Sequence, residues 1–155
     1  MPSMDIALNR PLEYEALNGF LRRWLPNGRF FLLYEGINDW ENVPKEQLII
    51  QYSVNEAQPG PFKYGLSVFA DQAEPLLFIE RLAQAVSQMF QCSTLCDATR
   101  VLLKANKTYY SLLFEAGQVY LVNDFDFEES GELTKIVSLN YVLPTETNDN
   151  VQFGS

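Results

Sequence analysis

The side chains with the greatest chemical potential in this chain are the carboxylates of residues 123–129, whose sequence is NDFDFEE. In an extended strand alternate side chains share a face, so Asp124 and Asp126 would stand roughly 6.5–7 Å apart. Inverting glycosidases hold their acid and base at a similar separation, but across a cleft and with one carboxyl group raised in pKa by burial. Two acids along one exposed strand are solvated charge, and we therefore predict that this protein is not an enzyme.

The same acidic run also has part of the spacing of a calcium-binding loop. The D-x-D pattern supplies oxygen ligands, but the glycine that turns an EF-hand loop and its distal glutamate are missing. Phe125 and Phe127, which separate the acids, favour a strand over a loop that wraps around a cation. We therefore expect no metal ion and no other cofactor.

Other catalytic groups are scarce. The chain has no histidine, which removes the commonest general base and the commonest metal ligand. It has neither a GxxxxGK[ST] nor a GxGxxG phosphate-binding motif. Cys92 and Cys96 are too few for a structural zinc site or a disulfide scaffold, and we interpret them as partly buried free thiols at a helix end.

The apolar periodicity predicts a single domain over residues 1–143 and a flexible tail over residues 144–155. Helical spacing of apolar residues covers residues 10–25, where Asn9 is the expected cap, and a second stretch from Asp71 or Glu74 to about residue 91. Short apolar or alternating segments bounded by turn residues predict strands. These strands are expected at residues 29–35, 47–54, 64–69, 98–105, 108–114, 118–127 and 133–143.

This order of elements, α-β-β-β-α-β-β-β-β, predicts an α+β fold with two main helices. Tight turns such as the one at residues 115–117 join consecutive strands as hairpins and leave no room for crossover helices. We therefore expect a mostly antiparallel sheet, with the last strands forming a meander and the helices covering one face.

The strand period places most of the acidic run on one side of the predicted strand 118–127. Tyr120, Val122, Asp124, Asp126 and Glu128 would point one way, and Glu129 and Glu132 would continue the row around the next turn. Charged strands prevent edge-to-edge aggregation, and such a row also suits recognition of a basic partner. The predicted partner-binding residues are Tyr120, Asp124, Asp126, Glu128, Glu129, Glu132 and Trp40.

Trp40 enters this prediction because Asp39 and Glu41 flank it in an expected loop. An exposed tryptophan beside carboxylates is a good anchor for a partner protein. The alternative is that this side chain folds back onto the core.

The distribution of charge supports a cationic partner. The chain has a net charge of −9, of which residues 1–110 carry −2, with twelve acids and ten bases, and residues 111–155 carry −7, with eight acids and one base. Nucleic acids and anionic membranes need clustered Lys and Arg, so neither is expected as a ligand. No apolar run reaches the roughly 18–20 residues that span a bilayer, and the first residues do not form a signal peptide, so we expect a cytoplasmic protein.

In its size, its acidity, its α+β element order and the acidic segment 124–129, the chain resembles the immunity proteins of bacterial polymorphic toxin systems, including contact-dependent inhibition. The resemblance implies a cytoplasmic inhibitor that occludes a basic, nuclease-type toxin domain with its acidic surface. The chain is also similar to type III secretion chaperones, which are acidic, dimeric α+β proteins that bind an effector, although it is expected to end in four strands instead of a final helix. A carboxylate-based enzyme is the third alternative, and monomer and weak dimer both stay open.

Overall fold

The computed structural model describes residues 3–25, 30–44, 48–69, 76–98 and 109–139, and it confirms the α+β fold class. The helical elements are α1 (Tyr14–Trp24), the 3-10 turn η1 (Trp40–Asn42), α2 (Leu76–Phe90) and the short α3 (Phe127–Ser130). The strands are β1 (Ser3–Leu8), β2 (Phe30–Tyr34), β3 (Leu48–Val54), β4 (Tyr64–Phe69), β5 (Thr94–Asp97), β6 (Tyr110–Glu115), β7 (Gln118–Asn123) and β8 (Thr134–Leu139).

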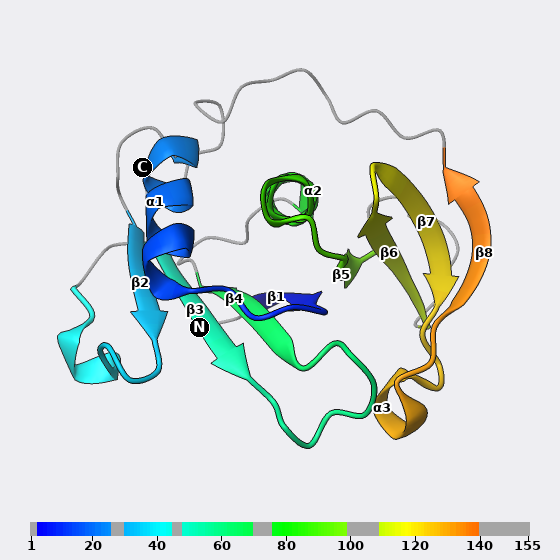
Figure 1. Ribbon diagram of the computed structural model, residues 1–155, viewed down its shortest axis with the longest axis horizontal. Helices are drawn as coiled ribbons and strands as arrows, with labels where there is room; N and C mark the ends of the chain where they lie inside the picture. The colour runs from blue at the N-terminus through cyan, green and yellow to red at the C-terminus, as the bar shows by residue number, and fades with distance from the viewer. Residues whose placement is uncertain (1–2, 26–29, 45–47, 70–75, 99–108, 140–155) are drawn as a thin grey trace.

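The strands form one eight-stranded sheet in the order β2-β3-β4-β1-β5-β6-β7-β8. All neighbours pair antiparallel except β2 and β3, which are parallel, so the prediction of a mostly antiparallel sheet is confirmed. Strands β5 to β8 form a meander, of which β6, β7 and β8 were expected and β5 was not. Figure 1 shows the sheet curling around α2, with β2 and β8 at its two ends.

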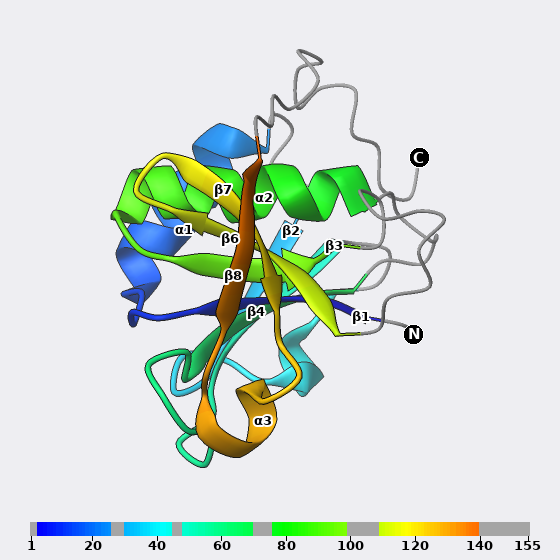
Figure 2. The ribbon, with the colours of Figure 1, turned by 90° about the vertical axis from the view of Figure 1, so that its right-hand side faces the viewer.

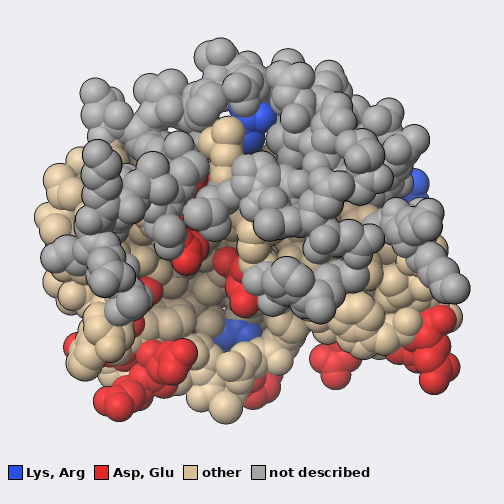
Figure 3. All heavy atoms as spheres, turned by 180° about the vertical axis from the view of Figure 1, so that it is seen from behind, with Lys and Arg blue, Asp and Glu red and all other residues tan. Residues whose placement is uncertain are grey.

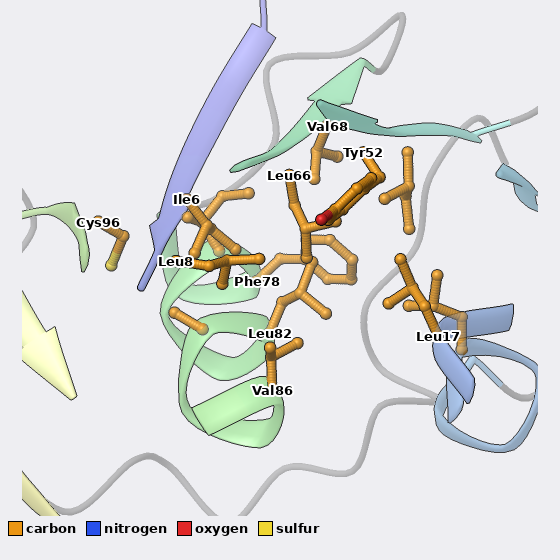
Figure 4. Close-up of a cluster of buried hydrophobic side chains, with 14 of the residues drawn as sticks. Ile6, Leu8, Leu17, Tyr52, Leu66, Val68, Phe78, Leu82, Val86 and Cys96 are labelled. Carbon is orange, nitrogen blue, oxygen red and sulfur yellow. The ribbon is translucent and has the colours of Figure 1, made fainter. Parts of the chain in front are cut away.

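The main core lies inside this curl. The apolar face of α2, including Phe78, Leu82 and Val86, packs against alternate strand residues such as Leu8 and Leu66, all of them fully buried (Figure 4). Helix α1 joins the same core through its apolar face. Both main helices therefore cover the same face of the sheet, because each has one apolar stripe to remove from water.

A second, smaller core lies on the opposite face of the sheet. Leu95, Leu113 and Val122, from β5, β6 and β7, pack there against Phe62 of the loop between β3 and β4. Phe127 of α3 packs on the edge of this cluster. The cluster joins the loop between β3 and β4 to the last strands of the meander.

The sequence analysis missed the first strand. Strand β1 lies at the centre of the sheet between β4 and β5, and its residues Ile6 and Leu8 are buried. Asn9 and Pro11, which follow this strand, were instead assigned to the start of the first helix. Asn9, the predicted cap of the first helix, instead accepts a hydrogen bond from the Ser93 backbone, and α1 begins only after Glu13.

The cysteines were placed only partly correctly. Cys92 follows the end of α2 as expected, but Cys96 lies in β5, a strand that the sequence analysis took for the end of a helix. Both thiols are free and buried, and burial raises the pKa of each. The predicted strand 98–105 falls almost wholly outside the described residues, as does the predicted tail 144–155.

The predicted strand 118–127 ends earlier than expected, at Asn123. The Asn123 side chain accepts a hydrogen bond from the Phe125 backbone, and the Phe127 backbone donates to the carbonyl of Asp124. An asparagine that bonds the backbone two residues ahead turns a chain out of a strand. The predicted row of acids along one strand face was therefore wrong: the acids beyond Asn123 lie on a turn and on α3.

Candidate protein-binding site

The acidic turn is held in place by the loop between β3 and β4 (Figure 2). The Gln58 side chain donates a 2.8 Å hydrogen bond to the carbonyl of Phe127, whose ring meets Phe62 edge-on at 5.9 Å between centroids. Gly131 ends α3 with a φ of +77°, and it lies so close to Pro59 that a Cβ would stand 2.4 Å from the Pro59 carbonyl oxygen. Only glycine satisfies both requirements.

Four of the predicted acids point into solvent from this turn, namely Asp126, Glu128, Glu129 and Glu132. Asp124 differs, because it is half-buried and its carboxylate accepts a hydrogen bond from the hydroxyl of Ser111. Seen from behind, carboxylates gather on both sides of the lower rim of the molecule (Figure 3). The turn thus presents a solvated negative surface and keeps one carboxylate for its own structure.

An exposed aromatic pair lies beside these acids. Phe125 is 62% exposed and Tyr109 is 52% exposed, and their rings meet edge-on with centroids 4.8 Å apart. The backbone of Asp124 donates to the Tyr109 carbonyl, which ties the two strand ends together. We call Tyr109, Phe125, Asp126, Glu128, Glu129 and Glu132 the α3 surface.

Tyr109 was not predicted from the sequence, and strand alternation would place Phe125 on the face opposite Asp124 and Asp126. Gly131 does not correct this prediction, because glycine is common both at the end of a helical turn and in a hairpin turn. Because β7 ends at Asn123, strand alternation no longer predicts that Phe125 is buried.

Tyr120 does not belong to this surface. Lys135 lies over its ring, with Nζ 4.2 Å from the centroid, and the same ammonium donates a 2.8 Å hydrogen bond to Glu115. This bond from Lys135 is the main cause that lowers the pKa of Glu115, and a second bond from Ser93 lowers it further. The predicted contact residue Tyr120 is therefore already engaged by a cation of its own chain.

Trp40 is also separate from the α3 surface. It starts η1, where Asp39 and Asn42 form a reciprocal capping box, and its ring meets Phe69 edge-on at 5.3 Å. Half of the side chain is exposed, so this residue folds back onto the sheet only in part. Figure 1 places η1 at the lower left and α3 at the lower right, so the fold does not unite Trp40 with the acids of α3.

The chemistry available elsewhere in the described residues is limited. Within them, no three His, Cys, Asp or Glu side chains form a group that could hold a metal ion. A cavity of about 440 Å³ adjoins Ser87, Cys92 and Glu115, but burial keeps the Cys92 thiol protonated, while Glu115 is kept ionised. Asp124 and Asp126 do not line that cavity.

None of the helices in the described ranges has the length and apolar character needed to cross a bilayer. Comparison with known proteins gives no match to a family model, a curated protein or a solved structure.

Proposed function

We propose that this protein is a non-enzymatic, cytoplasmic binding protein that recognises a cationic protein through the α3 surface. Within that class, its size, acidity and fold favour an immunity protein that occludes a basic toxin domain. The observation that carries the proposal is the exposed pair of Tyr109 and Phe125 beside four solvated carboxylates on a turn fixed by Gly131.

The aromatic pair is what distinguishes this surface from ordinary solubilising charge. Exposed carboxylates alone keep a protein soluble, and they need no neighbouring apolar surface. Two large rings left in water beside them have a hydration cost that a partner would remove, and buried aromatic side chains are the commonest anchors of protein interfaces. The combination suits a partner that presents Lys or Arg around an apolar patch.

The two kinds of residue would contribute at different steps of binding. Long-range attraction between the net charge of −9 and a basic partner raises the association rate, by roughly 10- to 1,000-fold in known cases. Burial of Phe125 and Tyr109 then slows dissociation. A toxin domain that grips phosphate must itself be basic, so the acidic surface would compete for the same cationic groups.

The test is reversal of the exposed acids. Asp126→Lys, Glu128→Lys and Glu129→Lys together should weaken binding to the partner, captured with the unaltered chain and identified by mass spectrometry, by about 100-fold or more, mainly through the association rate and more strongly at low salt. Asp124 is left unchanged because it bonds Ser111. Phe125→Ala should instead mainly raise the dissociation rate.

The matched control reverses three other exposed acids, Asp5 of β1, Glu15 of α1 and Glu41 of η1, which makes the same change in net charge outside the α3 surface. Surface plasmon resonance gives both rate constants, and circular dichroism verifies the fold of each variant. Equal losses in the two triple variants would mean that only net charge matters, and an unchanged affinity in the α3 variant would refute the proposed surface.

A further inference from the structure

A second cavity lies at the end of the sheet formed by β2, β3 and β4. A cavity of about 310 Å³ is lined by Tyr34 at the end of β2, by Tyr52 and Val54 of β3, and by Tyr64 at the start of β4. The register explains this convergence, because Tyr34 pairs directly with Tyr52, and Val54 pairs directly with Tyr64. Three tyrosines from three neighbouring strands therefore share one hollow.

The tyrosine wall is fixed before any ligand arrives. The rings of Tyr34 and Tyr52 stack at 4.6 Å between centroids, with 9° between their planes. Both hydroxyl groups bond the backbone of Leu12: Tyr34 donates to its carbonyl, and Tyr52 accepts from its N–H. Because stacking and the hydrogen bonds to Leu12 already hold these two side chains, they lose little conformational entropy on binding, which favours affinity.

The rim of the cavity is negative. Glu35 and Glu56 both line it and both are exposed, and none of the described lining residues is Lys or Arg. Glu13 also acts on the wall, because its charge adds to burial in raising the pKa of Tyr34.

The two bases that flank the lining in sequence are engaged elsewhere. Arg10 donates to the carbonyl of Phe90, and Lys63 donates to the carbonyl of Gln58. Within the described residues, neither Glu35 nor Glu56 forms an ion pair with a cation of the chain.

We propose that this cavity receives one lysine or arginine side chain of a bound protein segment. The aliphatic stem of such a side chain would lie on the tyrosines and Val54, which is 39% exposed, while its charged end would remain at the rim between Glu35 and Glu56. A neutral apolar side chain would fit the wall but leave the two carboxylates without a partner. The identity of the ligand as a protein side chain rests on the proposed function, whereas the preference of the cavity for a cation does not.

The experiment uses the full chain labelled with ¹⁵N and three blocked amino acids as probes: Nα-acetyl-lysine methylamide, its arginine counterpart, and the neutral norleucine counterpart. The two cationic probes should shift the backbone amide signals of Tyr34, Ser53 and Tyr64 in a saturable way, at millimolar concentration. The norleucine probe should bind at least about tenfold more weakly, because it lacks the charge that the rim attracts.

Glu35→Gln with Glu56→Gln removes the charge of the rim while keeping the shape of both side chains. This variant should lose about tenfold or more in affinity for the lysine probe. Glu128→Gln with Glu129→Gln removes the same charge from the α3 surface, and it should leave that affinity within about twofold. Amide signals outside the cavity report whether each variant keeps its fold.

Equal binding of norleucine and lysine, or an unchanged affinity in the Glu35/Glu56 variant, would overturn the proposal. The two proposals can fail separately. If the cavity prefers the lysine probe but reversal of the α3 acids leaves toxin binding intact, this site is upheld and the proposed function is refuted. The converse result, with α3 essential and no preference for lysine over norleucine, would do the opposite.

Discussion

The two edge strands of the sheet, β2 and β8, differ in how far their side chains are exposed. At the β2 end the strand is mostly buried, with Phe30, Leu32 and Leu33 each at most 9% exposed. At the β8 end most residues are exposed, including Ile136 at 48% and Val137 at 47%. One edge is closed by its own chain, and the other is left open in the described part of the structure.

Asn38 closes the β2 edge. Its side-chain oxygen accepts from the backbone of Tyr34, and its side-chain nitrogen donates to the carbonyl of Leu32. A peptide group of a neighbouring strand would bond the same two groups, so this carboxamide substitutes for a missing strand. Open strand edges invite pairing with other chains, and a side chain that occupies the edge prevents it.

The β8 edge has no such substitute among the described residues. Its one charged residue, Lys135, is drawn onto the face of the sheet by Glu115 and Tyr120. A bulge opposite Leu121 and Val122 is the remaining device that disturbs this edge. The buried end of the sheet is therefore closed by side-chain hydrogen bonds from Asn38, whereas the open end has only its bulge and the turn that leads into it among the described residues.

The largest effect is expected where that turn meets the rest of the molecule. Gly131→Ala should lower the free energy of unfolding by about 2–4 kcal/mol, because it adds backbone strain at positive φ and a collision with the Pro59 carbonyl. Gly117→Ala is the control: it has the same strain at a φ of +80° but nothing within 4 Å. Urea denaturation measures both, and equal losses would show that contact with Pro59 does not matter.

A smaller loss is expected at the closed edge. Asn38→Ala removes the partners of the Tyr34 N–H and the Leu32 carbonyl, which should cost about 1–3 kcal/mol because both groups are partly buried. In Asn42→Ala, the lost hydrogen bond to Asp39 is exposed, and the cost should be clearly smaller. Thermal and urea unfolding compare the two, and an Asn38 variant as stable as the Asn42 variant would mean that this edge needs no cap.

The ion pair beside β8 should give a pH-dependent effect. The pKa of Glu115 is lowered in the folded protein, so its contribution to stability is present above its ordinary value of 4.5 and is lost as the pH falls through the lower, folded value. Glu115→Gln should therefore flatten the decline in stability on acidification below pH 4.5. The effect on stability should be smaller than that of Gly131→Ala or Asn38→Ala, since the ion pair is partly exposed. Parallel acid profiles would exclude this contribution.

The smallest effect on stability is expected on the open strand itself. Ile136→Thr should change the free energy of unfolding by no more than about 0.5 kcal/mol, because the side chain is half exposed. Leu32→Thr, at a side chain that is 4% exposed, should lower the free energy of unfolding by more than about 2 kcal/mol. If Ile136 proves as sensitive as Leu32 in urea titrations, β8 is covered in solution.

Local patterns in the sequence were enough for most of the fold. The apolar stripe of α2 and the alternation of β4 lie where they were predicted, because each follows from the period of its own element. Strand β5 escaped prediction because its four residues are too few to establish an alternation, although pairing with β1 and β6 stabilises it. Strand β1 escaped although its six residues do alternate, with Ile6 and Leu8 buried and Asp5 exposed.

The sequence by itself determined that negative charge gathers in residues 111–155 and that the chain contains no histidine, since both are properties of composition. Only the tertiary structure decided which acids reach solvent: it turned Asp124 toward Ser111, carried the acids of α3 outward and joined Phe125 to Tyr109. It also brought together Tyr34, Tyr52 and Tyr64, which are far apart in the chain. The physical reason is that a period fixes the face of a residue only while its strand continues, and contacts between distant segments decide where the strand ends.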